Sequence, residues 1–187
     1  MASIVVRVLD VEDWSLYRAV RLAALADSPE AFLSTLSHEE SFTTEVWRSR
    51  LEQRNMFVAE DDGAARGLVG VLPRGPELAE IVSMWVHPAA RGSGLGDLLV
   101  RTALSWAYEQ GVPEVRLWAA EGNRHAERLY ERHGFRRTGI VQPIPDREGG
   151  QPHGAVERPV LDVQDTHDDR CHASDPDIRH GQRATDF

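Results

Sequence analysis

The sequence predicts one mixed α/β (α+β) domain, with about seven strands in a mostly antiparallel sheet and about four flanking helices. Short runs of β-branched and aromatic residues alternate along the chain with longer segments at helical spacing. Two of the short runs are joined by Asp61-Asp62-Gly63, which is a hairpin signal. A strand at 81–86, a helix at 95–110 and a strand at 115–119 follow one another, which predicts a parallel pair with a right-handed crossover.

The chain is expected to open with a strand at 4–9 and then a helix. Asp10 is suited to cap this helix, because its carboxylate can accept hydrogen bonds from first-turn amides. The helix is expected to end at Ser28-Pro29, where proline breaks the pattern. Its apolar stripe is predicted to comprise Leu16, Ala19, Val20 and Ala23.

A second helix is predicted from Thr43, as its N-cap, to about Arg54. Phe42 precedes the cap and has the spacing to Trp47 that a hydrophobic staple requires. A short helical piece at 29–33 comes between the two helices. After the parallel unit, a brief helix around Ala126, Leu129 and Tyr130 is expected to end at His133-Gly134-Phe135.

Four further strand-like runs complete the predicted sheet. The strand at 81–86 must end before Pro88, because proline cannot donate to a sheet ladder. A Pro/Gly turn at 73–76 leads into it, and a Pro/Gly-rich loop at 143–154 separates the last antiparallel pair. The four runs lie at 56–60, 68–72, 135–141 and 155–163.

Three glycines, Gly92, Gly94 and Gly96, fall over the first turn of the helix predicted at 95–110. First-turn amides lack partners within the helix and carry a partial positive charge, and glycines let a ligand approach the backbone. Arg91 adds a forked cation, so the stretch predicts a site for phosphate or pyrophosphate. Asp97 replaces the third glycine of the dinucleotide fingerprint, and no Gly-Lys-Ser/Thr follows, which excludes both common nucleotide loops. The helix stripe comprises Leu95, Leu98, Leu99, Ala103, Trp106 and Ala107.

Composition limits the class of protein. The chain has 187 residues, 41% hydrophobic and 27% charged, which suffices for one core. No apolar run approaches the ~18 residues of a membrane helix, and the N-terminus lacks the regions of a signal peptide. The single cysteine, Cys171, cannot form an intrachain disulfide, so we expect a cytoplasmic protein. The net charge of −9 disfavours nucleic acid and membranes as partners and favours cationic amines.

The C-terminal segment, 164–187, differs from the domain at 1–163. It is rich in Asp, Arg and His and has few apolar residues, so we expect a disordered polar tail. His167, Cys171, His172 and His180 lie in or near it without the spacing of a zinc site, and no metal is predicted.

Two motifs resemble those of the GNAT superfamily of acyl-coenzyme A-dependent N-acyltransferases. Arg91, Gly94 and Gly96 match its Gln/Arg-x-x-Gly-x-Gly/Ala signature. A second set, in the family's order, comprises Asn123, Ala126, Leu129, Tyr130, Gly134 and Phe135. The resemblance covers about 68–163, while the first 55 residues match the family only as a strand followed by two helices.

This resemblance implies a GNAT fold whose central parallel strands splay apart. It also implies that acetyl-CoA, bound as co-substrate without a metal, fills the gap between these strands. Its pantetheine arm would pair with backbone groups of one strand, and its pyrophosphate would bind the glycine turn. The cofactor-binding residues implied are Met84, Trp85, Val86, Arg91, Gly92, Ser93, Gly94, Leu95, Gly96, Asn123 and Tyr130.

Acetylation of an amine needs a base, because a free alkyl amine with a pKa near ~10 is mostly protonated at neutral pH. Glu80 is the first candidate, since period-2 alternation over six residues places it on the same strand face as Val86. Glu121 and His87 are alternatives. Tyr130 matches the family's general acid, which protonates the leaving thiolate; the alternative is a core tyrosine.

Three functions stay open from the sequence: an enzyme that acetylates a primary amine of a small molecule or peptide, a non-catalytic acyl-CoA-binding regulatory module, and an unrelated phosphate-binding domain. Family members are commonly homodimers, but no sequence feature fixes the oligomeric state. Trp85, Trp106 and Trp118 suit the core better than a cofactor site. Trp14 and Trp47 either shape the acceptor pocket or only pack.

Overall fold

The computed structural model describes residues 4–120, 122–142 and 156–162. In these ranges the strands are β1 (Ile4–Val8), β2 (Met56–Asp61), β3 (Ala64–Pro73), β4 (Leu78–Val86), β5 (Glu114–Leu117), β6 (Ala119–Ala120), β7 (Arg136–Gln142) and β8 (Val156–Asp162). The α-helices are α1 (Trp14–Asp27), α2 (Leu36–Glu40), α3 (Thr44–Ser49), α4 (Leu95–Glu109) and α5 (Arg124–Arg132). Three 3₁₀ turns are η1 (Val11–Asp13), η2 (Pro29–Ala31) and η3 (Pro88–Ala90).

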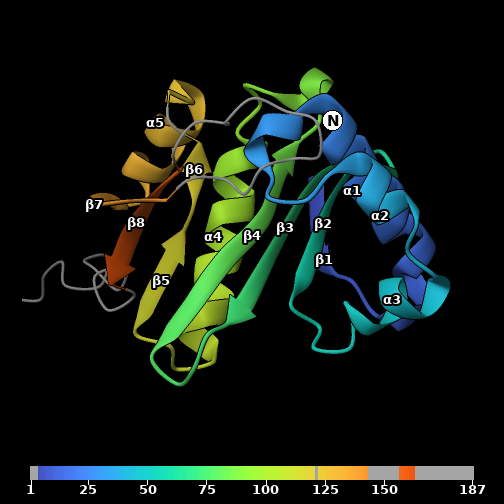
Figure 1. Ribbon diagram of the computed structural model, residues 1–187, viewed down its shortest axis with the longest axis horizontal. Coiled ribbons are helices and arrows are strands. Elements are labelled where there is room, and N and C mark those ends of the chain that lie inside the picture. Colours follow the sequence, from blue (N-terminus) through green and yellow to red (C-terminus); the bar gives the residue numbers. More distant parts are fainter. Residues whose placement is uncertain (1–3, 121, 143–155, 163–187) are drawn as a thin grey trace, which may run out of the picture.

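One mixed sheet runs through the protein in the order β1-β2-β3-β4-β5-β8-β6, with β7 paired to β8 (Figure 1). β4 and β5 are parallel, and the other pairings are antiparallel. The predicted α/β class and the central parallel pair are therefore confirmed. The strand expected at 115–119 is interrupted at Trp118, so β5 and β6 pair separately with β8, which gives an eight-stranded sheet.

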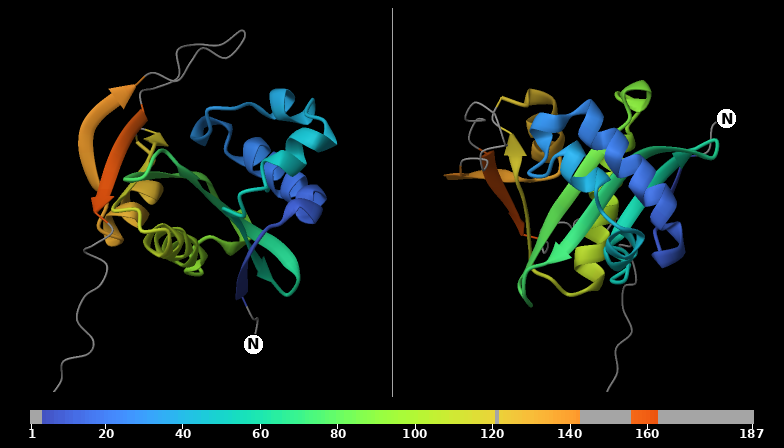
Figure 2. Two further views of the ribbon diagram at one scale, coloured as in Figure 1. Left: turned by 90° about the horizontal axis from the view of Figure 1, so that it is seen from below. Right: turned by 45° about the vertical axis from the view of Figure 1, so that its right-hand side comes forward.

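The helices cover both faces of the sheet. Helices α1 to α3 lie on one face and α4 lies on the other (Figure 2). Against α4, the core contains Val69, Val71, Ile81, Leu95, Leu99, Val115 and Phe135. Against α1 to α3, it contains Tyr17, Leu25, Trp47, Met56, Val58, Leu68 and Trp85. The sheet thus separates two apolar layers, and its middle strands contact both.

The two turns and the helix cap that the sequence predicts are present in the structure. Asp62 and Gly63 both have positive φ, 48° and 76°, which suits the tight hairpin between β2 and β3. Asp10 caps η1, with its carboxylate accepting from the amide of Glu12 and Asp13 accepting from the amide of Asp10. Gly134, at φ 81°, ends the segment after α5, and the Phe135 amide donates to the Tyr130 carbonyl over 3.1 Å.

Two predictions about the N-terminal helices are wrong. Ala19 and Ala23 are exposed, and the buried face of α1 comprises instead Tyr17, Val20, Arg21, Ala24 and Leu25. The small alanines bury little area, so they define a helix face poorly, whereas the aromatic Tyr17 fixes it. α3 ends at Ser49 rather than near Arg54, because the Leu51 and Arg54 amides form i−3 hydrogen bonds and Arg54 takes φ 50°.

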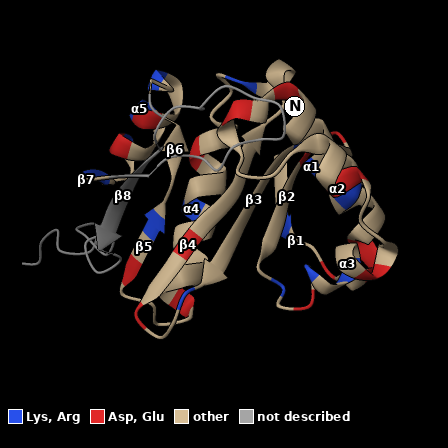
Figure 3. Cartoon of the chain, viewed as in Figure 1, with Lys and Arg blue, Asp and Glu red and all other residues tan. Residues whose placement is uncertain are grey.

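Acidic and basic residues are interspersed over the face of the protein drawn in Figure 3. Within the described ranges, no helix is long and apolar enough to cross a membrane. The same ranges hold no group of three His, Cys, Asp or Glu side chains placed to bind a metal ion. The predicted loop at 143–154 and tail at 164–187 lie outside the described residues.

Candidate active site

The two parallel strands diverge soon after they begin to pair. β4 and β5 are in register from Leu78 opposite Glu114 to Ile81 opposite Leu117, and in the described part of the chain the pairing stops there. Beyond this point β4 continues to Val86 against β3 only, while β6 turns to β8. On the edge of 82–86 that faces away from β3, the backbone groups therefore have no β5 partner, and the Val86 carbonyl accepts a hydrogen bond from Arg91 instead.

A β-bulge on β4 marks the divergence. Val82 pairs with Gly70 but Trp85 pairs with Leu68, so β4 has one residue more than β3 in this segment, and Ser83 adopts φ 56°. The extra residue reverses the alternation of side chains. Trp85 consequently shares the face of α1 to α3, while Val86 packs against the core on the α4 side.

The bulge overturns the argument that placed Glu80 and Val86 on one face. Glu80 pairs with Leu72, an even number of residues from Leu68, and so lies on the same face as Trp85. This is the face on which the principal cavity opens, and Glu80 contributes to its wall. The candidate base therefore stays at the site, but for a reason different from simple alternation.

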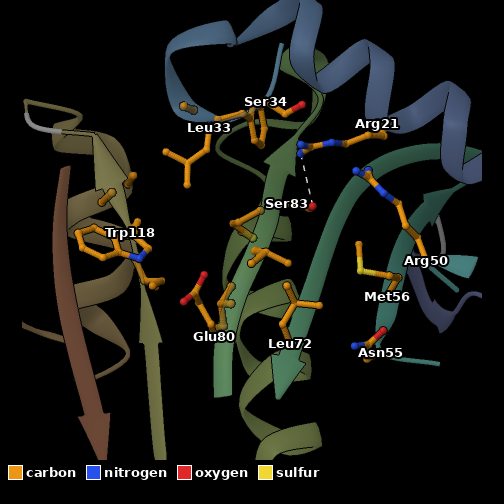
Figure 4. A pocket seen from close by; sticks show the side chains of 18 of the residues that line it. Arg21, Leu33, Ser34, Arg50, Asn55, Met56, Leu72, Glu80, Ser83 and Trp118 are labelled. Atoms are coloured by element: carbon orange, nitrogen blue, oxygen red, sulfur yellow. Dashed lines mark hydrogen bonds between the residues drawn. The ribbon is translucent and has the colours of Figure 1, made fainter. Parts of the chain in front are cut away.

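A cavity of about 510 Å³ occupies the divergence and extends beneath α1 to α3 (Figure 4). One end is formed by residues on the diverging strands and on α5: Glu80, Ile81, Val82, Ser83, Met84, Leu117, Trp118, Ala119, Ala120, Asn123, Ala126 and Tyr130. The other end is formed by the N-terminal helices and β2, with Tyr17, Arg21, Phe32, Ser34, Glu39, Arg50, Asn55 and Met56 among its residues. The gap between the strands and the space under the helices are thus continuous.

The glycine turn presents open backbone at the start of α4. Gly94 is the N-cap, with φ 87°, and Gly92 has φ 81°. A Cβ added at either position would meet nothing within 4 Å, so space is open beside both backbones. At Gly96 a Cβ would lie 3.2 Å from Leu129, so this glycine permits α4 and α5 to pack closely. The turn at which the sequence predicts an anion site is therefore open beside Gly92 and Gly94.

Arg91 is held beside this turn by two acceptors. Its Nε donates to the Val86 carbonyl over 3.1 Å, and its Nη2 is bound to the carboxylate of Asp27. The indole of Trp85 donates to the same carboxylate over 2.9 Å. The Arg91 side chain is 51% exposed, so it lies at the surface next to the glycine turn and not beneath another segment.

Asn123 and Tyr130 come from α5 and line the cavity together. The Asn123 side chain caps the helix, accepting from the Ala126 amide over 3.2 Å. The Tyr130 ring packs against Phe135, with a centroid distance of 5.7 Å. Burial raises the pKa of Tyr130 well above that of a free tyrosine, so its hydroxyl stays protonated at neutral pH. Both the packing and the acid interpretations of Tyr130 fit this position.

The candidate bases differ in position. Glu80 is 13% exposed at the cavity wall, and Arg74 approaches its carboxylate to 3.2 Å. His87 accepts from the Ala89 amide through Nδ1 over 3.1 Å and packs edge-on against Trp85, and it lies outside the cavity lining. Glu121 lies outside the described residues. Of the described candidates, only Glu80 reaches the cavity.

The sequence did not reveal the charged cluster at the other end of the cavity. Glu39 on α2 is 1% exposed, accepts from Arg21 over 2.8 and 3.0 Å, and accepts from Arg50 over 3.0 Å. Burial tends to raise the pKa of Glu39, but Arg21 and then Arg50 outweigh it and hold that pKa below its ordinary value. One local signal existed, because Arg21 lies between the apolar positions Tyr17 and Leu25 on one helix face.

The tryptophans divide between core and wall. Trp85 is 5% exposed and Trp47 is fully buried, and both pack in the core against α1 to α3. Trp14 and Trp106 are partly buried and pack beside the two cores. Trp118 instead contributes to the cavity wall, so its assignment to the core is wrong. Trp118 interrupts the strand between β5 and β6, which turns its ring toward the space between the strands.

Comparison with known proteins agrees with this geometry. The sequence profile of the Acetyltransferase (GNAT) family matches residues 21–135. A mycothiol acetyltransferase of Thermomonospora curvata is 34% identical over 117 residues, which cover 63% of this chain and 38% of that protein. The chain spans less than half the length of the curated relatives it matches.

Solved structures share the fold at low sequence identity. A putative acetyltransferase from Salmonella typhimurium, solved with its cofactor acetyl-CoA, superimposes with a TM-score of 0.70 at 20% identity, over 92% of this chain and 98% of that one. Spermidine N-acetyltransferase from Vibrio cholerae, in complex with CoA and spermine, gives 0.66 at 19% identity, over 86% and 96%.

Proposed function

The chain belongs to the Acetyltransferase (GNAT) family, and we propose that it transfers an acetyl group from acetyl-CoA to a primary amine of a small molecule or peptide. The observation that supports the proposal is the continuous cavity, which extends from the gap between β4 and β5 to the space beneath α1 to α3. Two substrates need two adjoining spaces. The similarity to a mycothiol acetyltransferase in sequence and to a spermidine N-acetyltransferase in fold supports the same activity.

The residues present suit acetyl-CoA. At 84–86 the edge of β4 that faces away from β3 has no β5 partner, and it suits the amides of a pantetheine arm, which would add to β4 as a strand does. The open backbone at Gly92 and Gly94, with the first-turn amides of α4, suits the pyrophosphate. Asn123 at the cavity wall would lie beside the same arm. When bound, acetyl-CoA supplies the thioester carbonyl that the amine attacks.

Two side chains are assigned to proton transfer. Glu80 removes a proton from the acceptor ammonium, directly or through a water molecule, because only the neutral amine is a nucleophile. The neutral amine forms the nitrogen–carbon bond, and as the carbon–sulfur bond breaks Tyr130 donates its hydroxyl proton to the departing sulfur. The nitrogen releases its second proton to water, and a proton from water restores the Tyr130 hydroxyl. Backbone amides at the strand divergence polarise the carbonyl.

The decisive experiment measures free thiol released from acetyl-CoA with a panel of amines, amino acids and peptides, with mass detection of each product. Acceptor-dependent thiol release and a product heavier by one acetyl group are expected. Binding of acetyl-CoA without turnover of any acceptor would instead favour a regulatory acyl-CoA-binding module. Absence of coenzyme A binding at millimolar concentration would exclude both the enzyme and the regulatory module.

The proposal also includes a cytoplasmic location, supported by the single cysteine, Cys171. We also propose a homodimer, as is common in the family. Analytical ultracentrifugation, which measures the mass of the protein in solution, tests it.

A further inference from the structure

The charged side chains that line the described cavity do not balance. They are Arg21, Arg50 and Arg74 against Glu39 and Glu80, which leaves one positive charge in excess. Arg74 is paired with Glu80 at the strand end. The excess therefore lies in the cluster of Arg21, Glu39 and Arg50, in a chain whose net charge is −9.

One carboxylate serves two guanidinium groups in this cluster. The Glu39 oxygen Oε1 accepts from Arg21, and Oε2 accepts from both Arg21 and Arg50. The Arg21 side chain is 8% exposed and that of Glu39 is 1% exposed, so water screens the cluster weakly. One negative charge thus faces two positive charges in a weakly screened site, so a second anion at this end of the cavity would be stabilised.

Both guanidinium groups are fixed in place by aromatic rings. Arg21 lies over Phe32, with its central carbon 4.6 Å from the ring centroid, and Arg50 lies over Phe42 at 4.7 Å. Stacked guanidinium groups are pre-organised for the planar, forked binding of a carboxylate. Figure 4 shows Arg21 and Arg50 approaching the cavity from α1 and from the end of α3.

The cluster is adjacent to the reaction end of the cavity. Arg21 Nη1 donates to the Ser83 hydroxyl over 3.4 Å, and Ser83 is the bulge residue two positions after the last pair between β4 and β5. Met84, the next residue, lines the gap between the strands. An acceptor whose anion lies beside Arg21 and Arg50 would therefore place a neighbouring amine at that gap.

We propose that the amine acceptor carries a carboxylate, as a free amino acid does, and that Arg50 and Arg21 bind this carboxylate as the missing counter-charge. The inference rests on the proposed acetyltransferase function. Leu33, Leu72 and Trp118 line the same cavity and suit an apolar side chain on the acceptor. Arg50 is the more accessible of the two arginines, because its side chain is 34% exposed.

The test compares matched acceptors. Acetylation is measured for the twenty L-amino acids and for the primary amides of those that react, and calorimetry measures their binding to the protein saturated with coenzyme A. Free acids are expected to exceed their amides in kcat/KM by about tenfold to hundredfold, the range of a charge-assisted hydrogen bond. Arg50→Gln should remove this preference through KM, and Arg50→Lys should restore part of it.

Arg48→Gln is the matched control, because Arg48 lies on the same helix but pairs with Glu12 at the surface. It should keep the preference for free acids. Amides or simple amines that react as well as the acids would overturn the carboxylate site while leaving the acetyltransferase intact. A failure to bind or acetylate any of the free acids would overturn it as well. Binding of free acids without thiol release from any acceptor would support the site and refute the proposed function.

Discussion

The guanidinium of Arg91 is bound to the carboxylate of Asp27, which lies 64 positions earlier in the chain. Trp85 donates to the same carboxylate, so one acidic side chain at the end of α1 joins the glycine turn to the end of β4. The hydrogen bonds from Trp85, Ser28 and Arg91 lower the pKa of Asp27 despite some burial. Asp27 therefore links the glycine turn, where the anion is expected to bind, to α1, which covers the cavity.

Arg91→Ala is expected to weaken acetyl-CoA binding by about tenfold, because the charge-assisted hydrogen bond donor near the pyrophosphate is lost. The Arg91 side chain is half exposed, so the free energy of unfolding should change by less than about 1 kcal/mol. Calorimetry and thermal denaturation measure the two effects. Arg101→Ala, on the exposed side of α4, serves as control. Equal affinity in the two variants would contradict this role for Arg91.

Gly94→Ala should weaken acetyl-CoA binding by about tenfold, because a methyl group enters the space above the first turn of α4. Its positive φ of 87° should cost about 1–2 kcal/mol in stability. Gly63→Ala is a matched control, since Gly63 also has positive φ and open space but lies in the β2–β3 turn. Both variants should lose stability, and only Gly94→Ala should lose affinity. Similar affinities would remove the glycine turn from the site.

Tyr130→Phe should lower kcat by about 100-fold or more, the usual contribution of a general acid, while the affinity for acetyl-CoA changes little. Since burial raises the pKa of Tyr130 above its ordinary value of 10.0, the wild-type rate should not fall through loss of this proton below pH 10. Steady-state kinetics from pH 6 to 10 checks both statements. Tyr108→Phe, at an exposed position on α4, should retain the wild-type rate. An unchanged kcat in Tyr130→Phe would return Tyr130 to a packing role.

Glu80→Gln should lower kcat/KM at neutral pH by about 10²-fold or more, because the acceptor amine then lacks a base. The deficit should shrink as the pH approaches ~10, where the amine is increasingly neutral without help. A pH profile of both proteins measures this convergence. Glu114→Gln provides the control, because Glu114 lies on β5 outside the cavity and pairs with Arg116. A deficit that is constant with pH would contradict the assignment.

Glu39→Gln should lower the free energy of unfolding by about 3–5 kcal/mol at neutral pH, because the buried Arg21 and the partly exposed Arg50 lose their shared carboxylate. The pKa of Glu39 is lowered in the folded protein, so its stabilising effect is present above the ordinary value of 4.5 and is lost as the pH falls through the lower, folded value. The difference in melting temperature should therefore narrow below pH 4.5.

Circular dichroism melts between pH 7 and pH 3 measure this narrowing. Glu12→Gln is the control, because Glu12 pairs with Arg48 at the surface with 75% of its side chain exposed, and its difference should stay small throughout. A difference for Glu39→Gln that persists unchanged at pH 3 would show that the ion pairs are not the source of the stability.

Local signals in the sequence sufficed where the structure depends on backbone chemistry. The Asp62-Gly63 hairpin, the end of the last helix at Gly134 and the turn at Gly94 all require backbone angles that few residues adopt, so their positions can be identified without knowledge of the fold. The predicted staple between Phe42 and Trp47 is likewise present, with ring centroids 5.7 Å apart. Each of these features involves residues close together in the chain.

The bulge at Ser83 shows where local reasoning fails. A serine in a strand-like run carries no mark of a left-handed backbone, and alternation therefore assigned Glu80 and Val86 to one face. The bulge depends on how β4 pairs with β3, which is a property of the sheet. The same applies to Trp118, whose place in the cavity wall follows from the interruption between β5 and β6.

The sequence alone determined the α/β class and the glycine turn that opens α4, because each depends on residue types at short spacing. It indicated roles for Asn123 and Tyr130 only through the resemblance of their motif to the GNAT family. Only the tertiary structure decided that Arg21, Glu39 and Arg50 form one charged cluster at the cavity. These residues come from three separate helical segments, and none of them has a partner within four positions that would reveal the cluster. Charge balance in a cavity is a property of side chains brought together in space, so it can be evaluated only once the fold is known.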